Sequence, residues 1–146
     1  MRSHAAGNAW LANAAPVPAA VHRAWVREEL AAIPTGGTWI VAEAPIMASV
    51  EAMQRIGSAR LGPVLAAPES DRAWWLLPLD ATEHLADVRR LTLPSPGWLL
   101  HCPPCETSLD GRCWLERPDG TGRLTDPALL GAAFGPAGRL PAEAFG

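Results

Sequence analysis

The sequence predicts an α+β fold with one small mixed or mostly antiparallel sheet and helices packed on a face. The expected elements alternate early between helix and strand and then continue mostly through strands and turns. The chain has 146 residues, 49% of them apolar and 18% charged, which suits one compact core. We therefore expect a single globular domain over 16–134, between a flexible N-terminus over 1–15 and a mobile C-terminal tail over 135–146.

Two helices and one strand are expected in the first half. Apolar residues recur at three- and four-residue steps over 18–33, as in an amphipathic helix. Segment 38–44 is short, apolar and β-branched, which predicts a buried strand closed by Pro45. Apolar residues at three-residue steps predict a second helix over 47–56, and Gly57 suits its C-terminal end.

The second half is expected to be richer in strands. Segments 62–66 and 73–79 predict a hairpin around the polar turn 68–71. A short helix follows over 81–88, with Asp80 as N-cap and Glu83 completing a capping box. Strands are expected over 90–93, 98–102 and 112–116, before a last helix up to Phe134 capped by Thr125 or Asp126.

The core predicted from these elements is rich in tryptophan and aliphatic residues. Its expected members are Trp25, Leu30, Trp39, Val41, Met53, Ile56, Val64, Leu76, Trp98, Leu100, Trp114 and Leu115.

Composition excludes several classes of function. All 12 basic residues are arginine, so a Schiff-base lysine and a P-loop lysine are both excluded. The net charge of −3 gives no basic field for a phosphate backbone, so nucleic acid is a possible but disfavoured partner. No apolar run approaches the length of about 20 residues that a membrane span needs, so a cytoplasmic protein without a membrane partner is expected.

The cysteines form the chemically densest segment. Cys102, Cys105 and Cys113 lie within twelve residues, and His101 precedes the first of them. Cys102 and Cys105 have the spacing of a zinc knuckle, with Cys113 as a third ligand and His101 or His84 as the fourth. The same pair after an apolar strand resembles a thioredoxin-type redox motif, although no helix follows to lower the thiol pKa. Packing of the cysteines as small apolar residues is the preferred interpretation, with zinc as the alternative cofactor.

No catalytic set is apparent. The sequence has no G-x-S-x-G elbow and no paired acids on an expected strand, so we assign no catalytic residue. The adjacent pairs Trp74–Trp75 and Arg89–Arg90 are candidate binding residues, because aromatic and guanidinium groups stack on bases. Alternation along a strand puts the two tryptophans on opposite faces, which favours core packing for them.

A resemblance covers the middle of the chain, from Ile33 to Pro118. The segments Pro34-Thr35-Gly36, Trp39-Ile40-Val41, Gly62-Pro63-Val64, Trp74-Trp75-Leu76-Leu77-Pro78 and Trp114-Leu115-Glu116-Arg117-Pro118 carry it. Together they resemble small bacterial proteins related to the N-terminal domain of bifunctional DNA primase/polymerases. That family has an RRM-like α+β core with acidic metal ligands and a strand histidine. The acidic pair does not carry over to this chain, so the resemblance implies a shortened, non-catalytic member.

These observations predict a non-catalytic binding or regulatory module whose partner is another protein. The alternatives are a small zinc-stabilised protein-interaction domain that uses the cysteine cluster, and a CxxC thiol oxidoreductase.

Overall fold

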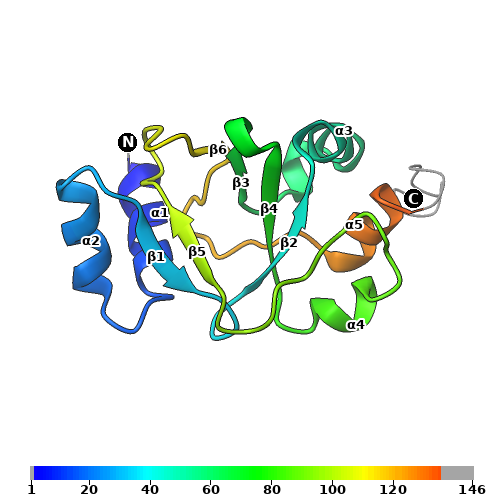
Figure 1. The fold of residues 1–146 in the computed structure, drawn as a ribbon, viewed down its shortest axis with the longest axis horizontal. Coiled ribbons are helices and arrows are strands. Elements are labelled where there is room, and N and C mark those ends of the chain that lie inside the picture. Colours follow the sequence, from blue (N-terminus) through cyan, green and yellow to red (C-terminus); the bar gives the residue numbers. More distant parts are fainter. Residues whose placement is uncertain (1, 136–146) are drawn as a thin grey trace.

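The fold is α+β, and both of its sheets are antiparallel. The structure is a computed structural model that describes residues 2–135. Figure 1 shows α2 and the β1–β5 pair at one end of an elongated molecule, and α3, α4 and α5 toward the other end. The predicted class is confirmed, but the described chain forms a four-stranded and a two-stranded sheet where one sheet was expected.

The elements are short and follow one another closely. The helices are α1 (Arg2–Ala12), α2 (Pro18–Val26), α3 (Ile46–Ile56), α4 (Ala81–Leu85) and α5 (Pro127–Ala133), with 3-10 turns at Ser58–Arg60 and Pro68–Ser70. The strands are β1 (Ala31–Pro34), β2 (Ile40–Ala44), β3 (Val64–Ala67), β4 (Arg72–Leu77), β5 (Leu99–Cys102) and β6 (Cys113–Glu116).

The four-stranded sheet is the centre of the molecule. Its strand order is β2-β4-β3-β6, so β6 lies at one edge. The hairpin of β3 and β4 is confirmed, with Val64 opposite Trp75 and Ala67 opposite Arg72. Every residue of β3 and all but the first of β4 are buried, because both faces of the sheet are covered.

Two hydrophobic cores lie on opposite faces of this sheet. On one face, α3, α4 and α5 pack against residues that include Trp75 and Leu77. On the other face, α1, α2 and the β1–β5 pair pack against Trp39, Trp74 and Leu76. The molecule is therefore layered, with three helices on one side and a helix-backed strand pair on the other (Figure 1).

The predicted helix over 18–33 is wrong in its second half. The helix ends at Val26, and Glu28 takes the left-handed conformation with φ 58°. The amide of Glu29 donates to the carbonyl of Ala24, and the amide of Glu28 donates to Trp25. This is a Schellman ending with glutamate where glycine is usual, so no glycine in the sequence marks the end of the helix. The following residues form β1, which pairs with β5 and creates the second sheet.

The N-terminus also differs from the flexible segment expected over 1–15. It forms α1, whose Leu11 and Ala12 are fully buried. Gly7 and Asn8 form the contact: the backbone amide of Cys105 donates to Asn8 Oδ1 at 2.8 Å, and Asn8 Nδ2 donates to Glu106. A Cβ atom on Gly7 would lie 2.2 Å from the carbonyl oxygen of Pro118. Glycine and asparagine are weak helix formers, yet Gly7 and Asn8 are the residues through which α1 contacts the segments at Cys105 and Pro118.

Smaller differences concern helix caps, one strand and the core. Asp80 precedes α4, but its side chain makes no capping hydrogen bond. Segment 90–93 forms an isolated bridge between Thr92 and Glu43 in place of a strand. Trp98 and Leu115, both predicted in the core, are each 36% exposed. The expected tail over 135–146 lies outside the described residues apart from Gly135.

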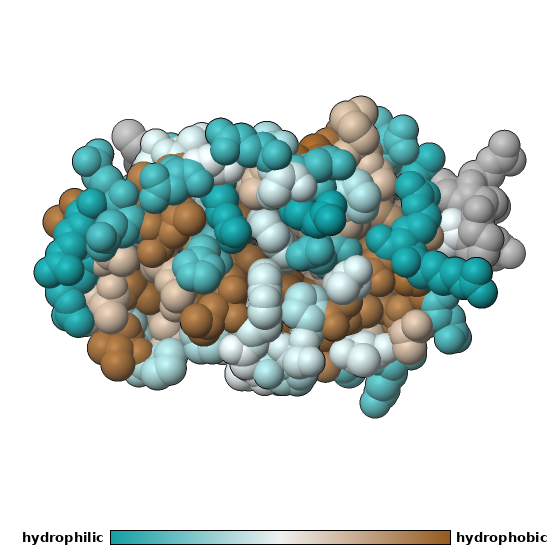
Figure 2. All heavy atoms as spheres, in the orientation of Figure 1, coloured by the Kyte–Doolittle hydropathy of each residue, from teal (hydrophilic) through white to brown (hydrophobic). Residues whose placement is uncertain are grey.

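A helix that spans a membrane must be long and apolar. Among the described residues, no helix is both long and apolar enough to cross a membrane. Figure 2 shows apolar side chains reaching this face in separate areas, over the α2–β1 end and near α4, with polar side chains between them.

Candidate functional site

The two tryptophans predicted to bind lie in the two separate cores. Trp75 is fully buried, and its indole donates to Ser49 Oγ at 3.1 Å. Trp74 is 4% exposed, and its indole donates to Glu43 Oε1 at 2.9 Å on the other face. The Arg112 guanidinium covers the Trp74 ring at 4.5 Å. Neither indole is available as a stacking platform in this arrangement.

The predicted basic pair lies elsewhere. Arg89 and Arg90 are exposed after α4. The Arg90 guanidinium lies 5.7 Å from the centre of the Phe134 ring, on the side of the sheet that carries Trp75. The tryptophan pair and the arginine pair therefore do not form one surface.

The cysteine segment is divided between buried and exposed positions. Cys102 in β5 is fully buried, whereas His101 beside it is exposed. Cys105 is 5% exposed, and its thiol donates to the carbonyl of Pro118 at 3.6 Å. Cys113 begins β6 and is half-buried. His84, the other suggested ligand, is exposed on α4 near Asp80.

This arrangement fits neither predicted alternative for the cysteines. Within residues 2–135, no group of three or more histidine, cysteine, aspartate or glutamate side chains is placed to hold a metal ion. Burial raises the pKa of Cys102, and it raises the pKa of Cys105 to about 12, with the nearby Glu106 charge adding to the shift. Thiols of this kind stay protonated, whereas a redox-active cysteine needs a lowered pKa.

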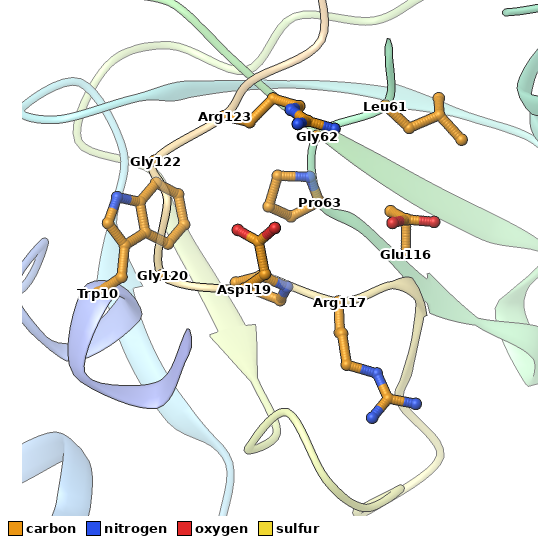
Figure 3. Close-up of a pocket in the computed structure, with 11 residues that line it drawn as sticks. Trp10, Leu61, Gly62, Pro63, Glu116, Arg117, Asp119, Gly120, Gly122 and Arg123 are labelled. Carbon is orange, nitrogen blue, oxygen red and sulfur yellow. The ribbon is translucent and has the colours of Figure 1, made fainter. Parts of the chain in front are cut away.

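A small polar pocket lies between α1 and the loop after β6. Trp10, Pro63, Glu116 and Asp119 line it together with the glycines of the loop (Figure 3). Its empty space is about 300 Å³ including the open mouth, but only about 20 Å³ admits the centre of a water molecule. The enclosed part therefore has room for one or two waters.

The two acids of the polar pocket differ in environment. Partial burial raises the pKa of Glu116, and the neighbouring Asp119 charge raises it further. Hydrogen bonds from the hydroxyl and amide of Thr121 lower the pKa of Asp119. Figure 3 shows the Arg117 side chain pointing away from Asp119 and Pro63. Asp119 is thus already used to shape its own turn, which leaves Glu116 as the free acid of the pocket.

The largest of the described hollows is an open groove between α3 and the edge strand β6. The centre of a water molecule can lie anywhere within about 500 Å³ of this groove. Val50 and Met53 of α3 line one side, Leu115 and Glu116 of β6 line the other, and Leu61 contributes from the turn between α3 and β3. The lining is mostly apolar, as is typical of ligand and peptide sites.

A second hollow lies at the start of the same strand. It provides about 200 Å³ and is lined by Cys113, Arg112 and Gly111 beside Pro68 and Glu69. The two hollows border β6 at residues 113 and 115–116. We call them together the β6 groove.

Sequence reasoning missed the β6 groove. Leu115 and Met53 were both predicted in the core from local apolar patterns, and these patterns do not distinguish a covered strand from an edge strand. Only the strand order shows that β6 has a neighbour on one side alone in the described chain.

Comparison with known proteins gives no relationship. No protein-family model, curated protein or solved structure matches the chain.

Proposed function

We propose that this protein is a non-catalytic binding or regulatory module that takes a short segment of another protein in the β6 groove. The observation that carries this proposal is the open, mostly apolar groove between α3 and β6, with the partly exposed Leu115 on its β6 side. An unpaired sheet edge beside a mostly apolar groove is a typical setting for binding an extended peptide segment.

The resemblance to primase/polymerase domains agrees with this proposal. In it, the chain is a shortened relative that keeps an α+β fold and has lost catalysis. Nothing in the polar pocket favours metal-dependent catalysis, since its acids are Glu116 and the internally bonded Asp119. Polymerase, nuclease and nucleotidyl-transfer assays with added magnesium or manganese are expected to be blank. Turnover that depends on Asp80 or Glu116 would overturn the non-catalytic part of the proposal.

A display library of short random peptides tests the binding function. Peptides selected on the natural protein should lose binding to Leu115→Glu, which places a charge in the groove. The matched control is Val26→Glu, which changes a residue 84% exposed on α2, at the far end of the molecule. Circular dichroism should show both variants folded.

Two outcomes would overturn the protein-binding proposal. One is selection that yields no saturable binder. The other is binding that persists in Leu115→Glu while a single-stranded DNA titration shows tight, salt-dependent association, since phosphate contacts produce a strong salt slope.

A further inference from the structure

We propose that the partner segment binds as an added β-strand along β6, with apolar side chains two residues apart and basic residues at its ends. This inference rests on the proposed function and specifies its mode and the chemistry of the partner. Strand addition of this kind combines backbone hydrogen bonds at a sheet edge with pockets for alternate side chains.

The first support is the position of β6. It is the last strand in the order β2-β4-β3-β6 and pairs with β3 on one side. Within residues 2–135 no strand pairs with its other side. An edge strand presents unpaired backbone donors and acceptors, which are a template for a further strand.

The second support is the spacing of the hollows. Ala66 pairs with Cys113 and Val64 pairs with Glu116, and Val64 belongs to the core on the α3 face of the sheet. Cys113 and Glu116 therefore lie on the same side of β6, and each of them lines one of the two hollows. Side chains two residues apart on a strand are separated by about 6.6–6.8 Å along it, so one added strand can place alternate side chains in the two hollows.

A β-bulge explains how Leu115 comes to line the groove. The register of β3 and β6 shifts between Val64 and Leu65, because Leu65 pairs with Trp114 while Val64 pairs with Glu116. Leu115 is the extra residue on β6. Bulges at sheet edges turn a side chain away from its regular direction, and here the bulged Leu115 lines the groove together with Glu116.

Charge gives the chemistry of the partner. Glu69 lines the hollow at the start of β6, and Glu116 lines the groove at its end. Neither carboxylate has an ion-pair partner within 4.0 Å in the described chain. Arg112 is the one cation that lines either hollow in the described chain, and its guanidinium is occupied with the Trp74 ring and the His101 carbonyl. Two carboxylates without an ion pair within residues 2–135, one in each hollow, complement a segment with arginine or lysine at both ends.

The test uses the peptides selected from the display library, made synthetically. Their sequences should share apolar residues at alternate positions and basic residues at the flanks. On binding, the backbone amides of residues 113–116 should exchange with deuterium more slowly, because they become paired. Peptides N-methylated at the amides facing the edge should bind at least about tenfold more weakly, since a methylated amide cannot donate.

Charge is tested with Glu69→Gln and Glu116→Gln combined, which keep the side-chain shape. Affinity for the basic peptides should fall about tenfold, and its dependence on salt should weaken. Glu83→Gln, an exposed acid on α4, is the matched control and should change nothing.

The failures are distinguishable. If no peptide is selected, the proposed function and this inference both fail. If peptides bind in a Leu115-dependent way but leave the exchange of the β6 amides unchanged, as a helix lying in the groove would, the strand mode fails alone. Equal affinity for acidic and basic peptides would overturn the charge assignment.

Discussion

At the scale of single residues, Gly7 carries the clearest structural consequence. Its Cα packs where a Cβ would lie 2.2 Å from the Pro118 carbonyl oxygen and 2.9 Å from Cys105 Sγ. Glycine normally weakens a helix relative to alanine. In this protein the same glycine allows α1 to approach the loop that follows β6, so its local cost is offset by docking.

We expect Gly7→Ala to lower the free energy of unfolding by about 1–3 kcal/mol, because the methyl group forces α1 away from Pro118. A helix that did not pack against this loop would give the opposite sign, since alanine favours helix over glycine. Thermal or urea unfolding measures the difference. Gly37→Ala is the matched control, because a Cβ there meets no atom within 4 Å. Stabilisation by Gly7→Ala would contradict the docked helix.

At the scale of elements, the sequence predicted regular patterns well and missed endings set by unusual residues. Helix α3 and the β3–β4 hairpin follow from apolar spacing and a polar turn. Strand β1 was missed because Glu28, and not glycine, ends the helix before it. The docking of α1 was missed because Gly7 and Asn8 act through contacts about a hundred residues away in sequence. Spacing rules contain no information about such partners.

The same limit applies to the candidate site. Leu115 and Met53 are apolar in sequence whether they are covered or line a groove, and the difference depends on which strand lies at the edge. Trp74 and Trp75 were correctly placed on opposite faces, because alternation along a strand depends on local geometry alone.

Helix caps give a prediction at this scale. Asp126 accepts a hydrogen bond from the Ala128 amide at 2.9 Å, whereas Asp80 makes no side-chain cap. Asp126→Ala should therefore cost about 1 kcal/mol of stability. Asp80→Ala should stay within about 0.5 kcal/mol, because its contact with His84 is exposed and long. Chemical denaturation compares the two variants, and an equal loss in both would contradict the difference in capping.

At the scale of the whole molecule, composition makes the alkaline behaviour simple to interpret. The chain has no lysine and no tyrosine, so the thiols are the main side chains that ionise between pH 9 and 12. Burial raises the pKa of both Cys102 and Cys105 above the ordinary value of 9.0. Above pH 9 the unfolded chain therefore loses thiol protons that the folded chain keeps, which favours unfolding.

We expect these two thiols to add no pH dependence to the free energy of unfolding below pH 9. Above pH 9 their ionisation in the unfolded chain should lower it. The fully buried Cys102 alone contributes a slope of about 1.4 kcal/mol per pH unit. The double variant Cys102→Ala, Cys105→Ala should be less stable at neutral pH, because packing is lost, but should show a shallower alkaline slope. Urea unfolding at several pH values measures both. An unchanged slope in the double variant would show that the thiols are not protected by the fold.

The layered arrangement leaves the β6 groove open at one edge of a sheet whose two faces are covered. One face is closed by α3, α4 and α5, and the other by α1, α2 and the β1–β5 pair. A partner that binds at the edge can therefore do so without disturbing either core. Binding should raise the unfolding temperature, and the rise should follow the logarithm of the peptide concentration once that concentration exceeds the Kd, as linkage requires.

The most direct measurement of the central claim is an NMR titration of the ¹⁵N-labelled protein with the tightest selected peptide. Saturable shifts of backbone signals should concentrate on α3 around Val50 and Met53 and on β6 around Leu115, and should be small on α2. Shifts centred instead on Arg89 and Arg90, or on α2, with β6 unaffected, would contradict the assignment of the β6 groove as the binding site.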